Sequence, residues 1–111
     1  MSRIEGSFYL KMIKGGNLLG EYTNNDIYSR SWEIANLKEA GDGPFLGKYK
    51  SQWLEVEGPY TGELVIERIE DISDTNKQYR LTWYRKNGEI AYMGEAILAD
   101  GMLMGHYINY Y

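Results

Sequence analysis

The stretch "LTWYRKNGEIAYMGEAILADGMLMGHY", residues 81 to 107, decides the fold. Large apolar and aromatic residues recur in it at every second position, which is typical of β-strands with one buried face. It is divided by Asn87-Gly88 and by Asp100-Gly101. Both dipeptides favour the positive φ angles of type I′ hairpin turns. The stretch therefore predicts antiparallel strands joined by tight hairpins.

The same alternation continues through the rest of the chain, and no segment has a helical period. Every connection is too short for the crossover that parallel strands need. We therefore expect an all-β fold: an eight-stranded antiparallel up-and-down β-barrel in which residues 1–111 form one domain. A β-sandwich is the alternative. The expected strands are 6–13, 18–24, 28–39, 45–56, 61–70, 78–86, 89–99 and 102–111.

A short motif supports closure of the barrel, since "LLGEY" at 18 to 22, "FLGKY" at 45 to 49 and "LMGHY" at 103 to 107 share one pattern. A glycine inside a strand permits the sharp bend of a small barrel. Because side chains alternate along a strand, inward glycines also place Tyr22, Tyr49 and Tyr107 inward. An aromatic ring on that face could cover the bare glycine of a neighbouring strand.

Composition excludes several classes of protein. The chain has 111 residues, no cysteine and a net charge of −4, with scattered basic residues that do not form the footprint of a nucleic-acid binder. No apolar run has the length of a signal peptide or a membrane span, so we expect a soluble, cytoplasmic protein. His106 is the only histidine, and we expect neither a metal nor a cofactor. No catalytic motif is present.

When the alternation of inward and outward side chains is followed along all eight expected strands, the two ends of the barrel interior are predicted to differ. One end collects aliphatic residues, and the other collects aromatic and polar ones, with all three tryptophans facing inward. Such a mixture is typical of small-molecule sites. The candidate ligand-binding residues are Asn24, Tyr28, Arg30, Trp32, Tyr49, Ser51, Trp53, Glu55, Trp83, Arg85, Tyr92 and Asn109.

Three functions remain open for the aromatic and polar end of the expected barrel. It could bind a small ligand, and Arg30 and Arg85 set against Glu55 could leave one positive charge for a ligand carboxylate. The barrel could instead be filled by its own side chains and act as a protein-interaction or inhibitor module. A cofactor-free cyclase-like or isomerase-like enzyme is a third reading, with Glu55 as its acid or base.

Eight short strands, bending glycines, and tryptophans with Asn, Ser and Tyr at one mouth make the chain resemble the calycin-type barrels, and among them the avidin/streptavidin-like fold. The resemblance covers the whole chain as architecture, and it implies a ligand site at the mouth of the barrel. The chain departs from the lipocalin pattern: "GSF" at 6 to 8 has phenylalanine where Gly-x-Trp is expected, and the last strand has no arginine.

The resemblance also implies pairing through the outer faces of the later strands. Independently, the outward positions of the last four strands carry a band of apolar residues, and such a patch usually marks an interface. We therefore expect a homo-oligomer that forms through Val65, Ile69, Tyr84, Met93, Ile97, Met104, Ile108 and Tyr110.

Overall fold

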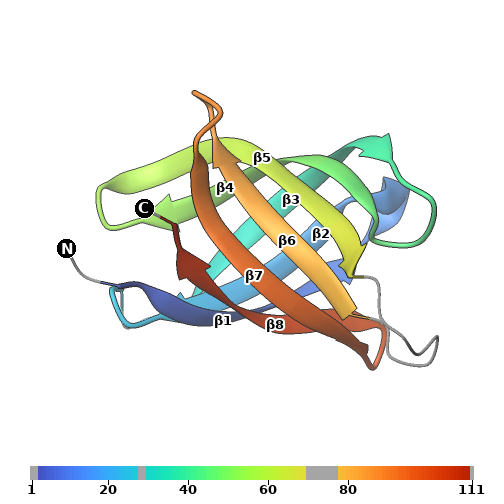
Figure 1. Ribbon diagram of the computed structural model, residues 1–111, viewed down its shortest axis with the longest axis horizontal. Coiled ribbons are helices and arrows are strands. Elements are labelled where there is room, and N and C mark those ends of the chain that lie inside the picture. Colours follow the sequence, from blue (N-terminus) through green and yellow to red (C-terminus); the bar gives the residue numbers. More distant parts are fainter. Residues whose placement is uncertain (1–2, 28–29, 70–77, 111) are drawn as a thin grey trace.

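The computed structural model describes residues 3–27, 30–69 and 78–110, and it confirms the eight-stranded antiparallel barrel. Each strand pairs with the next along the chain, and β1 pairs with β8 to close the sheet (Figure 1). A 3₁₀ turn, η1, spans Lys14–Gly16. The strands are β1 (Glu5–Met12), β2 (Leu18–Asn24), β3 (Ser31–Ala40), β4 (Gly47–Glu55), β5 (Gly58–Ile69), β6 (Gln78–Arg85), β7 (Ile90–Ala99) and β8 (Met102–Asn109).

Most strand boundaries agree with the expected ones, and β2 matches them at both ends. The main differences are at β5, which begins at Gly58 rather than at 61, and at β3, which begins at Ser31 rather than at 28. The expected strand ends at residues 28, 70 and 111 lie outside the described residues.

The two glycine turns that flank β7 differ from each other. Asp100 and Gly101 both have positive φ angles, 54° and 77°, as a type I′ turn requires. In the other hairpin Gly88 has a φ of 90°, whereas Asn87 is not in the positive region. There the N–H of Arg85 bonds to the carbonyl of Glu89 across a three-residue loop. The type I′ prediction is therefore right for Asp100-Gly101 and wrong for Asn87-Gly88.

Aliphatic side chains fill one part of the barrel interior completely. Leu18, Leu64, Leu81 and Leu103 come from four different strands, and each is 0 % exposed. Burying one leucine side chain stabilises a fold by roughly 1.5–3 kcal/mol. This packing holds the strands in place and leaves no space beside these leucines for another molecule.

Two inward glycines show how large rings fit into so narrow a barrel. A Cβ atom at Gly6 would come within 2.6 Å of the Tyr107 ring, and one at Gly62 within 2.7 Å of the Trp53 ring. Gly6 pairs with Tyr107 in the sheet, as the expected covering of glycine by an aromatic ring requires. Both rings can therefore lie flat along the barrel wall.

Strand β3 faces the other way from the prediction. Trp32 is 63 % exposed on the outer surface, while Ser31, Glu33 and Ala35 point inward and are buried. Arg30 is also exposed, and its Nε lies 2.9 Å from a carboxyl oxygen of Glu21. The expectation that Arg30 and Trp32 face the interior is therefore wrong. Glu33 takes the inward position, where Ser51 and Trp83 donate hydrogen bonds to one of its two carboxyl oxygens.

The described part of the chain contains no helix that is long and apolar enough to cross a membrane.

Candidate functional site

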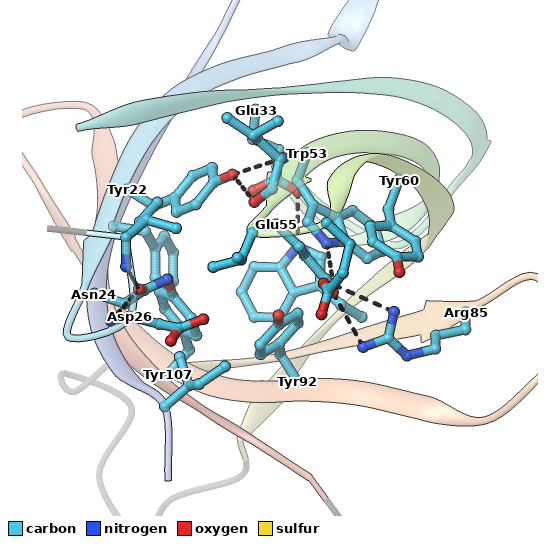
Figure 2. Close-up of a pocket in the computed structure, with 17 residues that line it drawn as sticks. Tyr22, Asn24, Asp26, Glu33, Trp53, Glu55, Tyr60, Arg85, Tyr92 and Tyr107 are labelled. Atoms are coloured by element: carbon cyan, nitrogen blue, oxygen red, sulfur yellow. Dashed lines mark hydrogen bonds and ion pairs between the residues drawn. The ribbon is translucent and has the colours of Figure 1, made fainter. Parts of the chain in front are cut away.

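A cavity of about 300 Å³ opens at the end of the barrel where β4 leads into β5 (Figure 2). Strand β1 begins and strand β8 ends at this same end (Figure 1). The residues that line the cavity come from all eight strands and from the segments next to them. They are Ile4, Phe8, Tyr22, Asn24, Asp26, Ile27, Glu33, Trp53, Leu54, Glu55, Val56, Glu57, Tyr60, Trp83, Arg85, Tyr92 and Tyr107.

Aromatic rings that contact one another edge to face form the wall. Phe8 and Trp83 have ring centroids 5.5 Å apart at 84°, and Tyr92 and Tyr107 have centroids 5.5 Å apart at 90°. Trp53 meets Tyr92 at 6.3 Å. Aromatic pairs prefer this arrangement, and it fixes each ring against its neighbour. The wall is therefore built of aromatic rings that hold one another in place, with polar groups between them.

Glu33 is the most deeply buried charged residue of the cavity lining, with 4 % of its surface exposed. Its Oε2 accepts hydrogen bonds from the hydroxyl of Ser51 and from the indole N–H of Trp83, the latter at 2.7 Å. No donor of the described residues bonds to its Oε1. One carboxyl oxygen is thus held by the barrel, and the other remains available to the cavity.

A second carboxylate, Glu55, lies nearer the mouth and is fully engaged. Its Oε2 accepts from the indole N–H of Trp53 at 2.8 Å, and its two oxygens accept from the two terminal nitrogens of Arg85 at 3.2 and 3.4 Å. Figure 2 shows Arg85 reaching across to this carboxylate. The Arg85 guanidinium also lies over the Tyr60 ring, 5.1 Å from its centroid. Both charges of this pair are therefore used within the protein.

Two polar contacts fix the opposite side of the mouth. The Asn24 amide donates to the Tyr107 hydroxyl at 2.8 Å, and its Oδ1 accepts from the backbone N–H groups of Asp26 and Ile27. The Tyr22 hydroxyl donates to the carbonyl of Leu54 and accepts from the Leu54 N–H at 2.7 Å. The second contact joins β2 to the end of β4, although β3 separates these two strands in the sheet.

Burial raises the pKa values of several ionisable side chains that line the cavity. Desolvation raises the pKa of Glu33 above its usual value of 4.5, and the hydrogen bonds from Ser51 and Trp83 oppose that effect without cancelling it. Burial also raises the pKa of the Tyr92 and Tyr107 hydroxyls, and the nearby charge of Glu55 adds to both. The tyrosines therefore stay neutral at ordinary pH, and burial makes ionisation of Glu33 less favourable than it is in water.

The structure brings together half of the sequence-predicted site. Asn24, Trp53, Glu55, Trp83, Arg85 and Tyr92 all line the cavity.

The other predicted residues lie elsewhere. Ser51 is buried next to Glu33 and does not line the cavity. Tyr49 lies outside the lining and donates to the Phe45 carbonyl at 2.8 Å, and burial raises the pKa of its hydroxyl to about 12. Asn109 accepts from the Ile4 N–H. Arg30 and Trp32 face solvent, and Tyr28 lies outside the described residues.

Sequence reasoning missed Glu33, which is the residue best placed for chemistry. A signal for it was present in the second half of β3, "ANLKEA". There Ala35 and Leu37 alternate with Asn36 and Lys38, and this order turns position 33 inward. Tyr22 and Tyr107 were expected to face inward, and the structure makes them part of the lining as well.

The outer face of β5 to β8 is less continuous than expected. One apolar row runs through Val65, Met93 and Ile108, and another contains Ile69, Ile97 and Met104. A polar row of Glu67, Arg80, Glu95 and His106 lies between them. The homo-oligomer stays a prediction, and sedimentation velocity tests it: a monomer at micromolar concentration would contradict it.

In the described residues no three His, Cys, Asp or Glu side chains converge so that they could hold a metal ion. Comparisons of the chain with protein-family models, with curated proteins and with solved structures found no match. The assignment of function therefore depends on the geometry of the cavity.

Proposed function

We propose that this protein binds a small organic molecule in the cavity at the open end of the barrel. The observation that carries the proposal is an opening of about 300 Å³ walled by fixed aromatic rings, with a buried carboxyl group among its lining residues. Ligand pockets are typically concave, mostly apolar and lined by a few placed polar groups, and an eight-stranded barrel has room for one small ligand.

Two measurements test the proposal. Native mass spectrometry of the protein purified from cells should detect a retained small molecule, and adding that molecule to stripped protein should change the tryptophan emission. The response should come from Trp53 and Trp83, which line the cavity.

The chain offers a matched pair of variants for this test. Trp53→Phe removes cavity wall together with an indole donor, and it should weaken the emission response. Trp32→Phe removes a tryptophan that is 63 % exposed on the outer surface, and it should leave the response intact. Absence of any retained molecule, together with no emission response across a broad metabolite screen, would contradict the proposal.

The alternative of a protein-interaction or inhibitor module has one observation in its favour. Leu54 and Val56 at the mouth are 44 % and 62 % exposed, and apolar residues around an opening can also meet a protein partner. The same mass-spectrometry experiment separates the two functions, because a module of this kind would be purified without a retained small molecule. An enzyme of the isomerase type would use Glu33 rather than Glu55, because both oxygens of Glu55 are engaged.

A further inference from the structure

The free oxygen of Glu33 limits which molecules the cavity can accept. Oε2 receives two hydrogen bonds, and in both of them the protein partner is the donor. When Glu33 is protonated its proton therefore belongs on Oε1, and when Glu33 is ionised Oε1 is an acceptor without a donor. An acceptor that borders a cavity in this way gains most from a charged donor supplied by the occupant.

The charges around the cavity favour a positive occupant. Among the described residues of the lining, the charged side chains are Asp26, Glu33, Glu55, Glu57 and Arg85, so carboxylates outnumber cations there by four to one. Arg85 is paired with Glu55 through two hydrogen bonds. A ligand carboxylate would thus meet repulsion and no free partner, contrary to the expectation from sequence.

The aromatic lining of the cavity also favours a positively charged occupant. Phe8, Tyr22, Trp53, Trp83, Tyr92 and Tyr107 line the space. Aromatic faces attract cations, and this attraction grows when both groups are removed from water. Aromatic lining and an excess of carboxylates are independent observations, and both point to an ammonium group.

We propose that the occupant is an organic amine with an apolar body, whose ammonium group donates a hydrogen bond to Oε1 of Glu33 within the aromatic wall. This inference rests on the proposed function and specifies the ligand class of the same cavity. Burial raises the pKa of Glu33, and an ammonium ion beside it would lower that pKa, so binding at a pH near the raised pKa releases a proton to solvent.

Glu33 is the group whose charge changes on binding. The titratable groups that interact with it are Tyr22 on β2 and Tyr107 on β8. Tyr92 on β7 lines the same cavity beside Glu55 on β4 and Arg85 on β6, which lie nearer the mouth. The three tyrosines have raised pKa values and stay neutral, and the last two residues are paired with each other. Proton release therefore reports on Glu33.

Three probes of one shape and different charge test the inference: phenethylamine, phenethyl alcohol and hydrocinnamate. We expect the amine to bind about tenfold more tightly than the alcohol, because a charged donor strengthens a hydrogen bond to a buried acceptor. Hydrocinnamate should bind most weakly. Calorimetry in two buffers with different ionisation enthalpies should show proton release with the amine and none with the alcohol.

Glu33→Gln should reduce the preference for the amine over the alcohol to about twofold or less, since the amide keeps an acceptor for Ser51 and Trp83 but cannot ionise. Glu95→Gln removes an exposed carboxylate from the outer face of β7 and should leave the preference unchanged. If Glu33→Gln does not fold, the proton-release measurement on the natural protein still decides the matter.

The outcomes separate the two proposals. Tighter binding of the alcohol or of hydrocinnamate, or amine binding without proton release at every pH tested across the titration of Glu33, would overturn the amine inference while the cavity remained a binding site. No binding of any probe, together with no molecule retained by the purified protein, would overturn the proposed function itself.

Discussion

The two ends of this barrel are built from the same eight strands, yet they differ in what fills them. Toward one end, Leu18, Leu81 and Leu103 are completely buried against one another. Toward the other end, Trp53 and Tyr92 surround open space, and Glu33 presents a carboxyl oxygen to it. Because strand pairing continues along the whole barrel, the sheet does not need packing at both ends. One end can therefore supply stability while the other keeps a cavity.

The largest expected effect is at the filled end. Leu81→Ala should lower the free energy of unfolding by about 2–5 kcal/mol, since Leu81 is 0 % exposed and its removal leaves a void. Leu54→Ala at the open end removes the same side chain from a position that is 44 % exposed, and it should change stability by about 0.5 kcal/mol or less. Chemical denaturation measures both variants, and equal losses would show that the ends do not differ as described.

The next effect concerns the polar contact deep in the barrel. Ser51→Ala removes one of the two donors to Oε2 of Glu33, and should cost about 1–3 kcal/mol because a buried acceptor loses a partner. The same denaturation experiment measures it. Ser51→Thr keeps the hydroxyl and serves as the control. A Ser51→Ala variant as stable as the natural protein would show that this hydrogen bond is not important for the fold.

Stability should depend on pH through Glu33. Its pKa is raised in the folded protein, so its contribution to stability is fully present below the unfolded value, near 4.5, and is lost as pH rises through the folded value. Between these two values the natural protein should lose up to about 1.4 kcal/mol per pH unit relative to Glu33→Gln. Thermal or chemical unfolding of both proteins across this window measures the difference. If the unfolding free energies of the two proteins changed in parallel across this pH window, the raised pKa of Glu33 would be contradicted.

The smallest effect is expected at the mouth. Arg85→Gln breaks the ion pair with Glu55, which retains the Trp53 donor, and it should cost about 1 kcal/mol or less. Added salt should reduce the difference between the variant and the natural protein, since partly exposed charges are screened. Denaturation at low and high salt measures this, and a loss as large as that of Leu81→Ala would contradict the division of the barrel into two unlike ends.

The fold could be predicted from sequence because strand alternation and glycine turns are local signals. The segments around Asp100-Gly101 carry both signals, and β7 and β8 appear where these predict them. The hairpin at Asn87-Gly88 shows the limit. The dipeptide fits two kinds of turn, and the pairing of Arg85 with Glu89 selects the three-residue loop.

The site was only half predictable, because a few interactions between distant residues override local pattern. Trp32 and Ile34 look like core residues, and that appearance assigned β3 to the wrong face. The burial of Glu33 depends on Ser51 and Trp83, which lie 18 and 50 residues farther along the chain. Alternation within β3 shows that one face is buried, but it does not show which face has hydrogen-bond donors opposite it.

The contact between Tyr22 and Leu54 has a consequence for the time scale on which the cavity can open. It joins β2 to the end of β4 through one hydroxyl group, which both donates to and accepts from the same backbone residue. This contact breaks when the Tyr22 side chain changes its χ1 rotamer, because rotation of the ring alone leaves the hydroxyl in place; widening the sheet would require several ladder hydrogen bonds to break together. The width of the mouth can therefore fluctuate quickly while the barrel as a whole remains folded.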